Sequence, residues 1–204
     1  MRVIAGTFRS RPLLAPEGLD TRPTADRLRE TLFNVLTQGA VDRVAGAAFL
    51  DLYAGSGAVG IEALSRGAAS ATFVEQGAAA LAVLKKNLDN LGIRGAAALV
   101  EKRSVGRFLR GAMEKGLPAG FGLVFLDPPY ELASEYESTL SLLGGEGGSL
   151  LAPAALVVAE HRRKQALAES YGSLKRVRLL EQGDAALSFY EAAGGKDIPD
   201  MPGL

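Results

Sequence analysis

The stretch Asp51-Leu52-Tyr53-Ala54-Gly55-Ser56-Gly57-Ala58-Val59-Gly60 is a glycine-rich turn between an apolar run and a helical pattern. Its glycines match the spacing G-x-G-x-x-G, and the apolar run before them predicts a buried strand. Glycine lets the backbone approach an adenosine-bearing ligand at a distance that a Cβ would obstruct. The stretch therefore predicts an α/β fold with a nucleotide-cofactor site at the end of its first core strand.

Short apolar runs alternate with longer helical patterns downstream of residue 45, as in βαβ units around a mostly parallel sheet. The predicted strands cover 48–53, 71–75, 97–101, 123–127 and 155–160, and the predicted helices cover 58–66, 78–91, 105–115 and 134–143. Two further strands, 175–180 and 185–191, flank a turn-rich gap that predicts an antiparallel pair. The expected fold is a doubly wound, mixed, seven-stranded α/β sheet.

The first 45 residues depart from this rhythm and predict a small N-terminal extension. Residues 2–5 and 12–15 can pair as a hairpin, and Thr24 can cap a helix over 25–36. The chain then divides into the extension 1–45, a core domain 46–192 and a flexible tail 193–204 in which Gly and Pro recur. The glycine-rich stretch 144–149 predicts a flexible surface connection.

The composition excludes several kinds of chemistry. The 204 residues include no Cys, no Trp and one His, which rules out disulfides, thiolate zinc sites, Cys nucleophiles and His-based triads. The single histidine, His161, is predicted to be a surface residue without a catalytic part. Basic and acidic residues balance at 23 each, but the basic ones concentrate in 1–29 and 161–178, which favours a basic face. No apolar run is long enough for a membrane span or a secretory signal, so we expect a cytoplasmic protein, and we expect no metal site.

A second strand-ending acid narrows the choice of cofactor. Glu75 follows Gly55 by twenty residues, and a carboxylate there can accept hydrogen bonds from both ribose hydroxyls. A dinucleotide would place its pyrophosphate at the turn, where Asp51 would repel it. S-adenosylmethionine (AdoMet) has no phosphate and carries a cationic amino-acid tail that Asp51 can contact. The turn, with Gly55 and Gly57 against the ligand, therefore favours AdoMet.

The tetrapeptide Asp127-Pro128-Pro129-Tyr130 ends an apolar strand, and its carboxyl end is expected beside the cofactor. The Asp127 carboxylate and the Pro128 carbonyl can accept the two hydrogens of an exocyclic NH₂ group, and Tyr130 can stack on the base. An aromatic amine is a poor nucleophile because its lone pair is delocalised into the ring. The two hydrogen bonds favour a pyramidal nitrogen that faces the AdoMet methyl group. The tetrapeptide therefore predicts methyl transfer by alignment, with Asp127, Pro128 and Tyr130 as catalytic residues and Asp127 also at the cofactor.

The chain resembles class I AdoMet-dependent amino-methyltransferases, whose motif (D/N)-P-P-(Y/F/W) is matched by residues 127–130. More narrowly, residues 2–6 and 22–34, together with the glycine turn, resemble the bacterial 16S ribosomal RNA (guanine-N2) methyltransferases of the guanine-966 type. The resemblance covers residues 1 to about 192 and implies a Rossmann-like class I methyltransferase. It implies methylation of the exocyclic N2 of one guanine in 16S ribosomal RNA, within a partly or fully assembled small subunit. We also expect the protein to be a monomer.

The resemblance assigns further residues to the cofactor and to the RNA. Family members often carry Asp or Asn after the third strand to hold the adenine amino group, and Ser104 takes that position here. In and just before the N-terminal helix, three arginines are expected to bind phosphates around a flipped guanine, and two polar residues are expected to shape its pocket. With one proline of the tetrapeptide, these RNA-binding candidates are Arg22, Arg27, Arg29, Asp26, Asn34 and Pro129.

Three other functions stay open from the residues alone. An adenine-N6 DNA methyltransferase would use the same tetrapeptide, although a small chain without a target-recognition domain favours structured RNA. A nicotinamide-dependent oxidoreductase would use the glycine turn and Glu75. A non-catalytic RNA-binding module would keep the fold, but the intact tetrapeptide argues against it.

Overall fold

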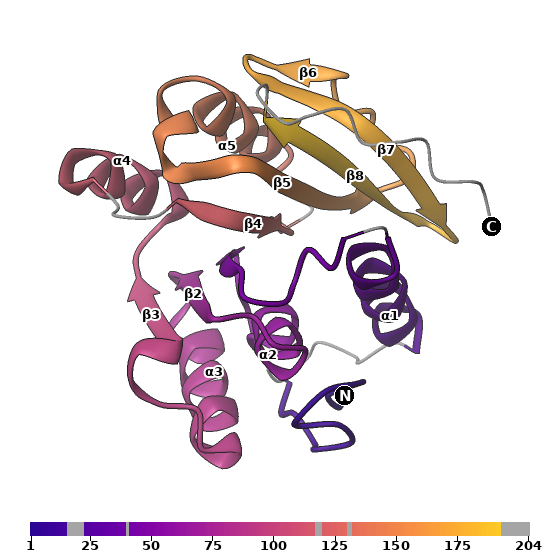
Figure 1. Ribbon diagram of the computed structural model, residues 1–204, viewed down its shortest axis with the longest axis vertical. Helices are drawn as coiled ribbons and strands as arrows, with labels where there is room; N and C mark the ends of the chain where they lie inside the picture. Colours follow the sequence, from indigo (N-terminus) through magenta and orange to yellow (C-terminus); the bar gives the residue numbers. More distant parts are fainter. Residues whose placement is uncertain (16–22, 40, 117–119, 130–131, 193–204) are drawn as a thin grey trace.

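A mixed sheet lies at the centre of the molecule, with helices on both faces (Figure 1). The computed structural model describes residues 1–15, 23–39, 41–116, 120–129 and 132–192. Within these ranges the sheet has eight strands in the order β3-β2-β1-β4-β5-β8-β7-β6. The parallel strands are β1 (Ala48–Leu52), β2 (Ser70–Glu75), β3 (Ala98–Lys102), β4 (Phe121–Leu126) and β5 (Leu151–Arg162). The antiparallel strands are β6 (Ser170–Tyr171), β7 (Leu174–Gln182) and β8 (Ala185–Ala192).

The helices form two layers. One face of the sheet carries α1 (Pro23–Thr37), α2 (Ala58–Ser65) and α3 (Ala78–Leu91), and the other carries α4 (Val105–Lys115) and α5 (Ser134–Gly144) (Figure 1). Successive residues of β1 point to opposite faces of the sheet. Phe49 packs in the core with α1 to α3, and Leu50 packs in the core with α4 and α5. Burial of these two apolar layers is the main source of stability for such a fold. Among the helices of the described residues, none is long and apolar enough to cross a membrane.

The strand order places the carboxyl ends of β1 and β4 in the middle of one sheet edge. β1 pairs with β2 on one side and with β4 on the other, so successive crossovers leave this point in opposite directions. In open α/β sheets, ligands bind outside the carboxyl ends of the strands at such a switch point. The predicted doubly wound, mixed sheet is therefore confirmed, and the helices predicted over 78–91 and 105–115 have those bounds in the structure.

The sheet also contains one strand that the sequence did not predict and one that is longer than predicted. β6 has two residues, too few for a periodic pattern to show. β5 begins at Leu151 instead of residue 155 and passes through Pro153 and Ala154, of which Ala154 has a φ of 59°. Proline and a left-handed residue are both atypical of a strand interior, which explains the late predicted start.

The stretch 144–149, predicted to be a flexible connection, is a packed turn. It leads from α5 into the short 3₁₀ helix η2 (Glu146–Leu150). A Cβ on Gly144 would lie 1.7 Å from the Tyr171 carbonyl oxygen, so glycine is needed here for close backbone contact. The glycine content reflects tight packing between α5 and β6, and the prediction of flexibility was wrong.

His161, predicted to be a surface residue, is only 3% exposed. Its Nε2 lies 2.9 Å from Ser188 Oγ, and its Nδ1 lies 3.0 Å from the Arg162 carbonyl oxygen. The ring also meets Tyr136 edge-on, with 6.3 Å between the ring centroids. Burial lowers the pKa of His161, so the ring is a neutral member of the core. The surface prediction was wrong because β5 continues through His161 to Arg162.

The N-terminal extension follows the predicted outline with two changes. Arg2 pairs with Pro12 in an antiparallel bridge, and the Leu13 amide donates to the Met1 carbonyl at 3.0 Å, so a hairpin is present, but it joins residues 1–3 to 10–13 and not 2–5 to 12–15. Helix α1 begins at Pro23, so the next residue lies inside the first turn and does not cap the helix from outside. Proline suits the first helical position because its φ is already set and its missing N–H has no helical partner there. The predicted tail, 193–204, lies outside the described residues.

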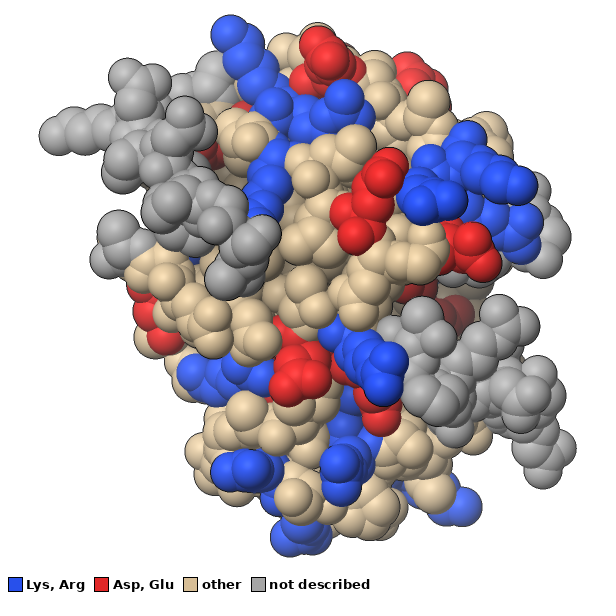
Figure 2. All heavy atoms as spheres, turned by 90° about the vertical axis from the view of Figure 1, so that its right-hand side faces the viewer, with Lys and Arg blue, Asp and Glu red and all other residues tan. Residues whose placement is uncertain are grey.

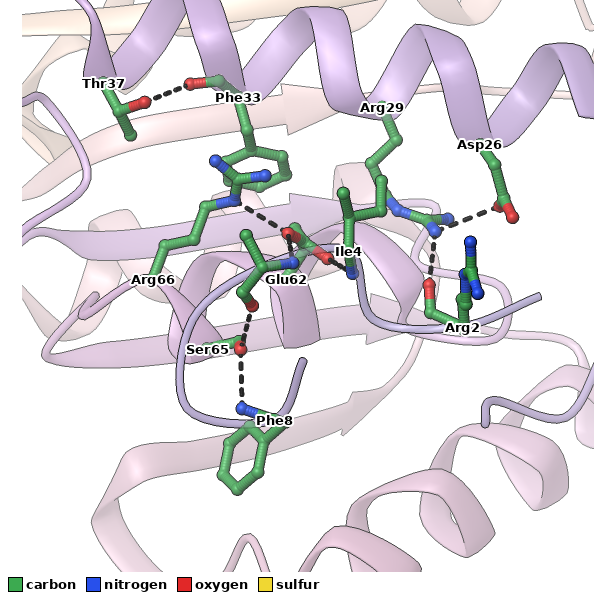
Figure 3. Close-up of polar contacts among 11 residues, drawn as sticks. Arg2, Ile4, Phe8, Asp26, Arg29, Phe33, Thr37, Glu62, Ser65 and Arg66 are labelled. Atoms are coloured by element: carbon green, nitrogen blue, oxygen red, sulfur yellow. Dashed lines mark hydrogen bonds and ion pairs between the residues drawn. The ribbon is translucent and has the colours of Figure 1, made fainter. Parts of the chain in front are cut away.

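Polar side chains of α2 hold this hairpin against the rest of the molecule (Figure 3). Glu62, which is 0% exposed, accepts hydrogen bonds from the Ile4 and Ala5 amides at 2.7 and 3.0 Å. The same carboxylate accepts a hydrogen bond from Arg66 Nε at 2.7 Å. Ser65 donates from its hydroxyl to the Ala5 carbonyl. The extension is therefore joined to α2 by directional, charge-assisted bonds as well as by apolar packing.

We expect Glu62→Gln to lower the free energy of unfolding by about 2 kcal/mol, because hydrogen bonds to a charged acceptor are the stronger kind. The amide also replaces one carboxylate oxygen with an NH₂ group, which cannot accept from the backbone amides or from Arg66. Urea denaturation measures the loss. Glu114→Gln, an exposed change on α4, is the matched control and should shift stability by less than about 0.5 kcal/mol. Equal denaturation midpoints for the two variants would contradict the role of Glu62.

Candidate active site

A buried carboxylate lies near the carboxyl end of β1. Asp51 is 2% exposed, and its Oδ2 accepts a hydrogen bond from the Gly60 amide at 2.9 Å. Within the described part of the chain, no ion pair reaches Asp51. Burial raises the pKa of Asp51 to about 8, the charges of Asp127 and Glu75 add to the rise, and the Gly60 N–H opposes it. An unpaired buried carboxylate of this kind favours a cationic partner.

The glycine loop that follows β1 leaves no room for side chains on its inner side. Gly55 and Gly57 have φ values of 56° and 79°, a left-handed conformation that glycine adopts without strain. A Cβ on Gly57 would lie 2.3 Å from Leu84 Cδ1, and a Cβ on Gly60 would lie 2.4 Å from Phe73 Cε1. Packing against Leu84 and Phe73 therefore fixes the loop, and a ligand on the other side would meet its backbone.

Glu75, at the end of β2, holds the same loop. Its Oε2 accepts a hydrogen bond from the Gly55 amide at 2.9 Å, and its Oε1 accepts one from the Gly77 amide at 2.6 Å. A carboxylate offers about four acceptor positions, so two positions are left for the hydroxyls of a ribose. The structure thus brings together the two residues that the sequence spacing had linked.

Tyr53 joins the glycine loop to α5, a contact that was not predicted from the sequence. Its hydroxyl donates to Glu135 Oε2 at 2.6 Å and lies 2.9 Å from Thr139 Oγ1. Tyr53 has a φ of 64°, and a non-glycine residue held there costs on the order of 1–3 kcal/mol. Burial and Glu135 raise the pKa of Tyr53, so the phenol stays neutral. A large aromatic residue inside a glycine motif was the available signal.

The tetrapeptide predicted to be catalytic begins directly after β4. Asp127 is half-buried, Pro128 is buried and Pro129 is exposed. The Pro129 carbonyl accepts a hydrogen bond from the Leu132 amide at 2.8 Å. Burial raises the pKa of Asp127 to about 7. Tyr130 lies outside the described residues, so its stacking role stays a prediction.

A further acid, Glu160, stands beside Asp127 and was also missed. β4 and β5 pair with Leu126 opposite Ala159, so the residues that follow on each strand are neighbours on one face of the sheet. Burial raises the pKa of Glu160 well above its ordinary range, the charge of Asp127 adds to the rise, and Arg29 opposes it. The predicted strand 155–160 already ended in this acid, which is the signal that had identified Glu75.

Ser104 stands at the amino end of α4, beside a cavity between α4 and α5. It occupies the N-cap position, yet its side chain makes no capping hydrogen bond. The cavity has a volume of about 240 Å³ and is lined by Ser104, Gly106, Leu109, Arg110, Glu135, Ser138, Thr139 and Leu142. A hydroxyl that does not cap its own helix suits the predicted contact with adenine, which stays a prediction.

The RNA-binding candidates on α1 lie in different environments. Arg27 is exposed and borders a hollow of about 400 Å³ between α1 and the N-terminal hairpin. The hollow is lined by Arg2, Ile4, Arg9, Ser10, Asp26, Arg27 and Glu30. Arg29, in contrast, is 6% exposed, and its Nη2 donates to the Arg2 carbonyl at 2.8 Å and to Asp26 Oδ1 at 3.0 Å (Figure 3). Arg29 was predicted to bind phosphate, but in the structure its side chain is buried and bonded within the protein. It therefore supports the N-terminal segment.

The predicted basic face carries both signs of charge. Figure 2 shows the side of the molecule that lies at the right in Figure 1. Lys and Arg side chains stand at its top, at its upper right and over its lower part, and Asp and Glu side chains lie between these groups. Asn34 is half-buried on α1, and Arg22 lies outside the described residues. The RNA-binding roles of both residues stay predictions.

The residues present fit AdoMet better than a dinucleotide. Asp51 offers a carboxylate with no ion pair in the described part of the chain for an ammonium group, and Glu75 offers acceptors for a ribose. At Gly55 a Cβ would meet no atom closer than 4.0 Å, so the loop leaves open space there for a ligand. A pyrophosphate would meet Asp51, Glu75 and Asp127, whose charges already disfavour one another. When bound, AdoMet supplies an electrophilic methyl group on a sulfonium. Fold and site together define a class I AdoMet-dependent methyltransferase.

Comparison with known proteins identifies the family. A family model described as Conserved hypothetical protein 95 matches residues 1–191. The chain is 40% identical to Ribosomal RNA small subunit methyltransferase D of Escherichia coli over 97% of this chain and 93% of that protein. It is 39% identical to the protein of the same name from Haemophilus influenzae, over 82% of this chain and 81% of the relative. The chain therefore belongs to the small-subunit methyltransferase D family, the guanine-966 type that its motifs resemble, and its cofactor is AdoMet.

Solved structures agree on the architecture. Hypothetical protein TTHA0928 of Thermus thermophilus superposes with a TM-score of 0.73 at 31% identity, covering 94% of this chain and 99% of that one. The 16S rRNA N2 G1207 methyltransferase of Thermus thermophilus, solved with AdoMet and guanosine, has a TM-score of 0.64 at 20% identity. It covers 86% of this chain and 44% of that one, a likeness of fold. Membership of an AdoMet-dependent family also removes the nicotinamide-dependent alternative.

Proposed function

We propose that the protein transfers a methyl group from AdoMet to the exocyclic N2 of a specific guanine in 16S ribosomal RNA. The names of the relatives support ribosomal RNA of the small subunit as the substrate. We further propose that the RNA is methylated within a partly or fully assembled small subunit. The observation that carries the proposal is the position of Asp127 and Pro128 one strand away from Asp51. β1 and β4 pair with Asp51 opposite Phe125, so the amine-binding and cofactor-binding carboxylates share one end of the sheet.

Alignment of the target amine is the main task of the chain. Asp127 and the Pro128 carbonyl accept the two N–H groups of the amine, which turns the nitrogen lone pair toward the cofactor side. Pro129, exposed at the turn, borders the extruded base. Holding two reactants in the productive geometry contributes up to about 7–11 kcal/mol to the lowering of a barrier. No strong base is needed before the nitrogen attacks.

A proton must leave after transfer, because the nitrogen forms a bond to the methyl carbon while it still carries both hydrogens. The Asp127 carboxylate, whose pKa burial raises to about 7, is placed to accept one of them. Glu160 lies next to Asp127 on β5 and can share that proton, because two adjacent carboxylates favour holding one proton between them. The products are then a neutral methylamino group and S-adenosylhomocysteine.

Methyl transfer from labelled AdoMet tests this function directly. Small subunits purified from a bacterial strain that lacks its own enzyme of this family are incubated with the protein, beside free 16S RNA and duplex DNA. Label should enter RNA of the assembled particles, and mass mapping should place it on N2 of one guanine. Label in DNA alone would instead support the adenine-N6 methyltransferase, which uses the same tetrapeptide, and would refute the proposal.

A further inference from the structure

One buried side chain of α3 is bonded to two distant segments at once. Asn87 is 0% exposed, and its Oδ1 accepts a hydrogen bond from the Leu14 amide at 2.8 Å. Its Nδ2 donates to the Leu14 carbonyl at 3.1 Å and to the Ser56 carbonyl at 3.0 Å. An amide side chain has two N–H donors and one carbonyl acceptor, and Asn87 uses all of them on these two residues.

The two partners of Asn87 belong to different functional parts of the chain. Ser56 lies between Gly55 and Gly57, at the centre of the glycine loop, which we call the cofactor loop. Leu14 follows the N-terminal hairpin and precedes, in sequence, helix α1 with its exposed Arg27. Asn87 is thus the point at which the cofactor loop and the extension meet a common side chain.

The geometry of an amide makes the two contacts interdependent. The oxygen, nitrogen and hydrogens of the amide lie in one plane. If the Asn87 amide moves with Ser56, both of its bonds to Leu14 therefore change as well. A buried N–H without a partner is costly, so the amide resists losing either residue. Any ligand that orders Ser56 therefore favours an ordered Leu14, and a ligand that orders the extension favours an ordered cofactor loop.

We propose that Asn87 is a positioning residue that couples the AdoMet site to the N-terminal extension, so that cofactor and RNA strengthen each other's binding. The RNA half of this inference rests on the proposed function, whereas the cofactor half does not. Coupling between two sites commonly changes affinity by roughly 5- to 150-fold. By thermodynamic reciprocity, the factor is the same whichever ligand binds first.

Hydrogen–deuterium exchange tests the cofactor half without RNA. S-adenosylhomocysteine is added as a ligand that cannot donate a methyl group, and exchange is followed at the Leu14 amide. We expect exchange to slow by about fivefold or more when the ligand is bound. Asn87→Ala should abolish this response, whereas Asn90→Ala, an exposed change on the same helix, should keep it. An unchanged rate at Leu14 in the wild-type protein, or a full response in Asn87→Ala, would overturn the inference.

The RNA half is tested by measuring the dissociation constant for small subunits with and without saturating S-adenosylhomocysteine. The ligand should tighten binding at least about fivefold in the wild-type protein and in Asn90→Ala, and less than about twofold in Asn87→Ala. Leu14→Pro is a second variant for the case in which Asn87→Ala does not fold. This change removes the backbone N–H of Leu14, a residue whose side chain is exposed, and leaves the bond between Asn87 and Ser56 in place. The variant should also lose the coupling.

The outcomes separate the two proposals. Failure of the small subunits to bind in any variant would count against the proposed function, while exchange at Leu14 still decides the role of Asn87. Tight binding that is equally strong with and without the ligand in the wild-type protein would leave the function intact and refute the coupling.

Discussion

Asp127→Ala should reduce methyl transfer by about 10³-fold, because the change removes both an acceptor for the target amine and the nearest acceptor for its proton. The cofactor site should survive. The charge of Asp127 raises the pKa of Asp51, so its removal leaves Asp51 more readily ionised and S-adenosylhomocysteine binding unweakened near neutral pH. Single-turnover transfer to small subunits and calorimetric titration of the ligand measure the two effects separately.

Asp127→Asn is the matched control for this change. The amide oxygen can still accept one hydrogen of the amine but carries no charge, so the rate should fall between those of the wild type and Asp127→Ala. An activity near that of the wild type would assign catalysis to alignment alone and leave the proton to another acceptor. If Asp127→Ala retained full turnover, the assignment of the tetrapeptide as the catalytic motif would fail.

Much of the fold could be predicted because it is encoded locally. The helix over 78–91 carries Leu81, Leu84, Leu88 and Leu91 at helical spacing, and Gly92, with a φ of 69°, ends it as a C-cap. The helix over 105–115 also ends at a glycine with a positive φ, Gly116, whose φ is 68° but whose ψ of 153° lies outside the αL region. Apolar periodicity and a terminal glycine both act within one turn of the chain, so the sequence shows them directly.

The candidate site could be predicted only in part, because some of its residues act through distant partners. The pairing of Gly55 with Glu75 follows from the strand order of the fold and was expected. The burial of Arg29 follows from the return of the N-terminal hairpin across α1, and nothing in the neighbouring sequence encodes it. Asn87 borders the apolar stripe of its helix, three residues after Leu84 and four before Leu91, but an asparagine is ordinarily exposed to water. Its burial requires Leu14, 73 residues away, to lie against α3.

AdoMet affinity should fall as the pH drops below about 8. Burial raises the pKa of Asp51 to about 8, so the side chain loses its charge over this range when no ligand is bound. A cationic tail binds the ionised form, and below this pKa each pH unit costs up to about tenfold in affinity. We therefore expect the dissociation constant to rise by up to about 100-fold between pH 8 and pH 6. Isothermal titration calorimetry across that range measures it.

Asp51→Asn supplies the control for this pH dependence. The amide cannot titrate, so the variant should bind AdoMet weakly and with little change between pH 6 and pH 8. The α-amino group of the ligand, with an ordinary pKa near 7.7–8.0, loses its charge as the pH rises and would change affinity in the opposite sense. Any slope that survives in Asp51→Asn belongs to the ligand or to Asp127. A flat profile in the wild-type protein would show that Asp51 stays ionised throughout, and that its burial does not govern cofactor binding.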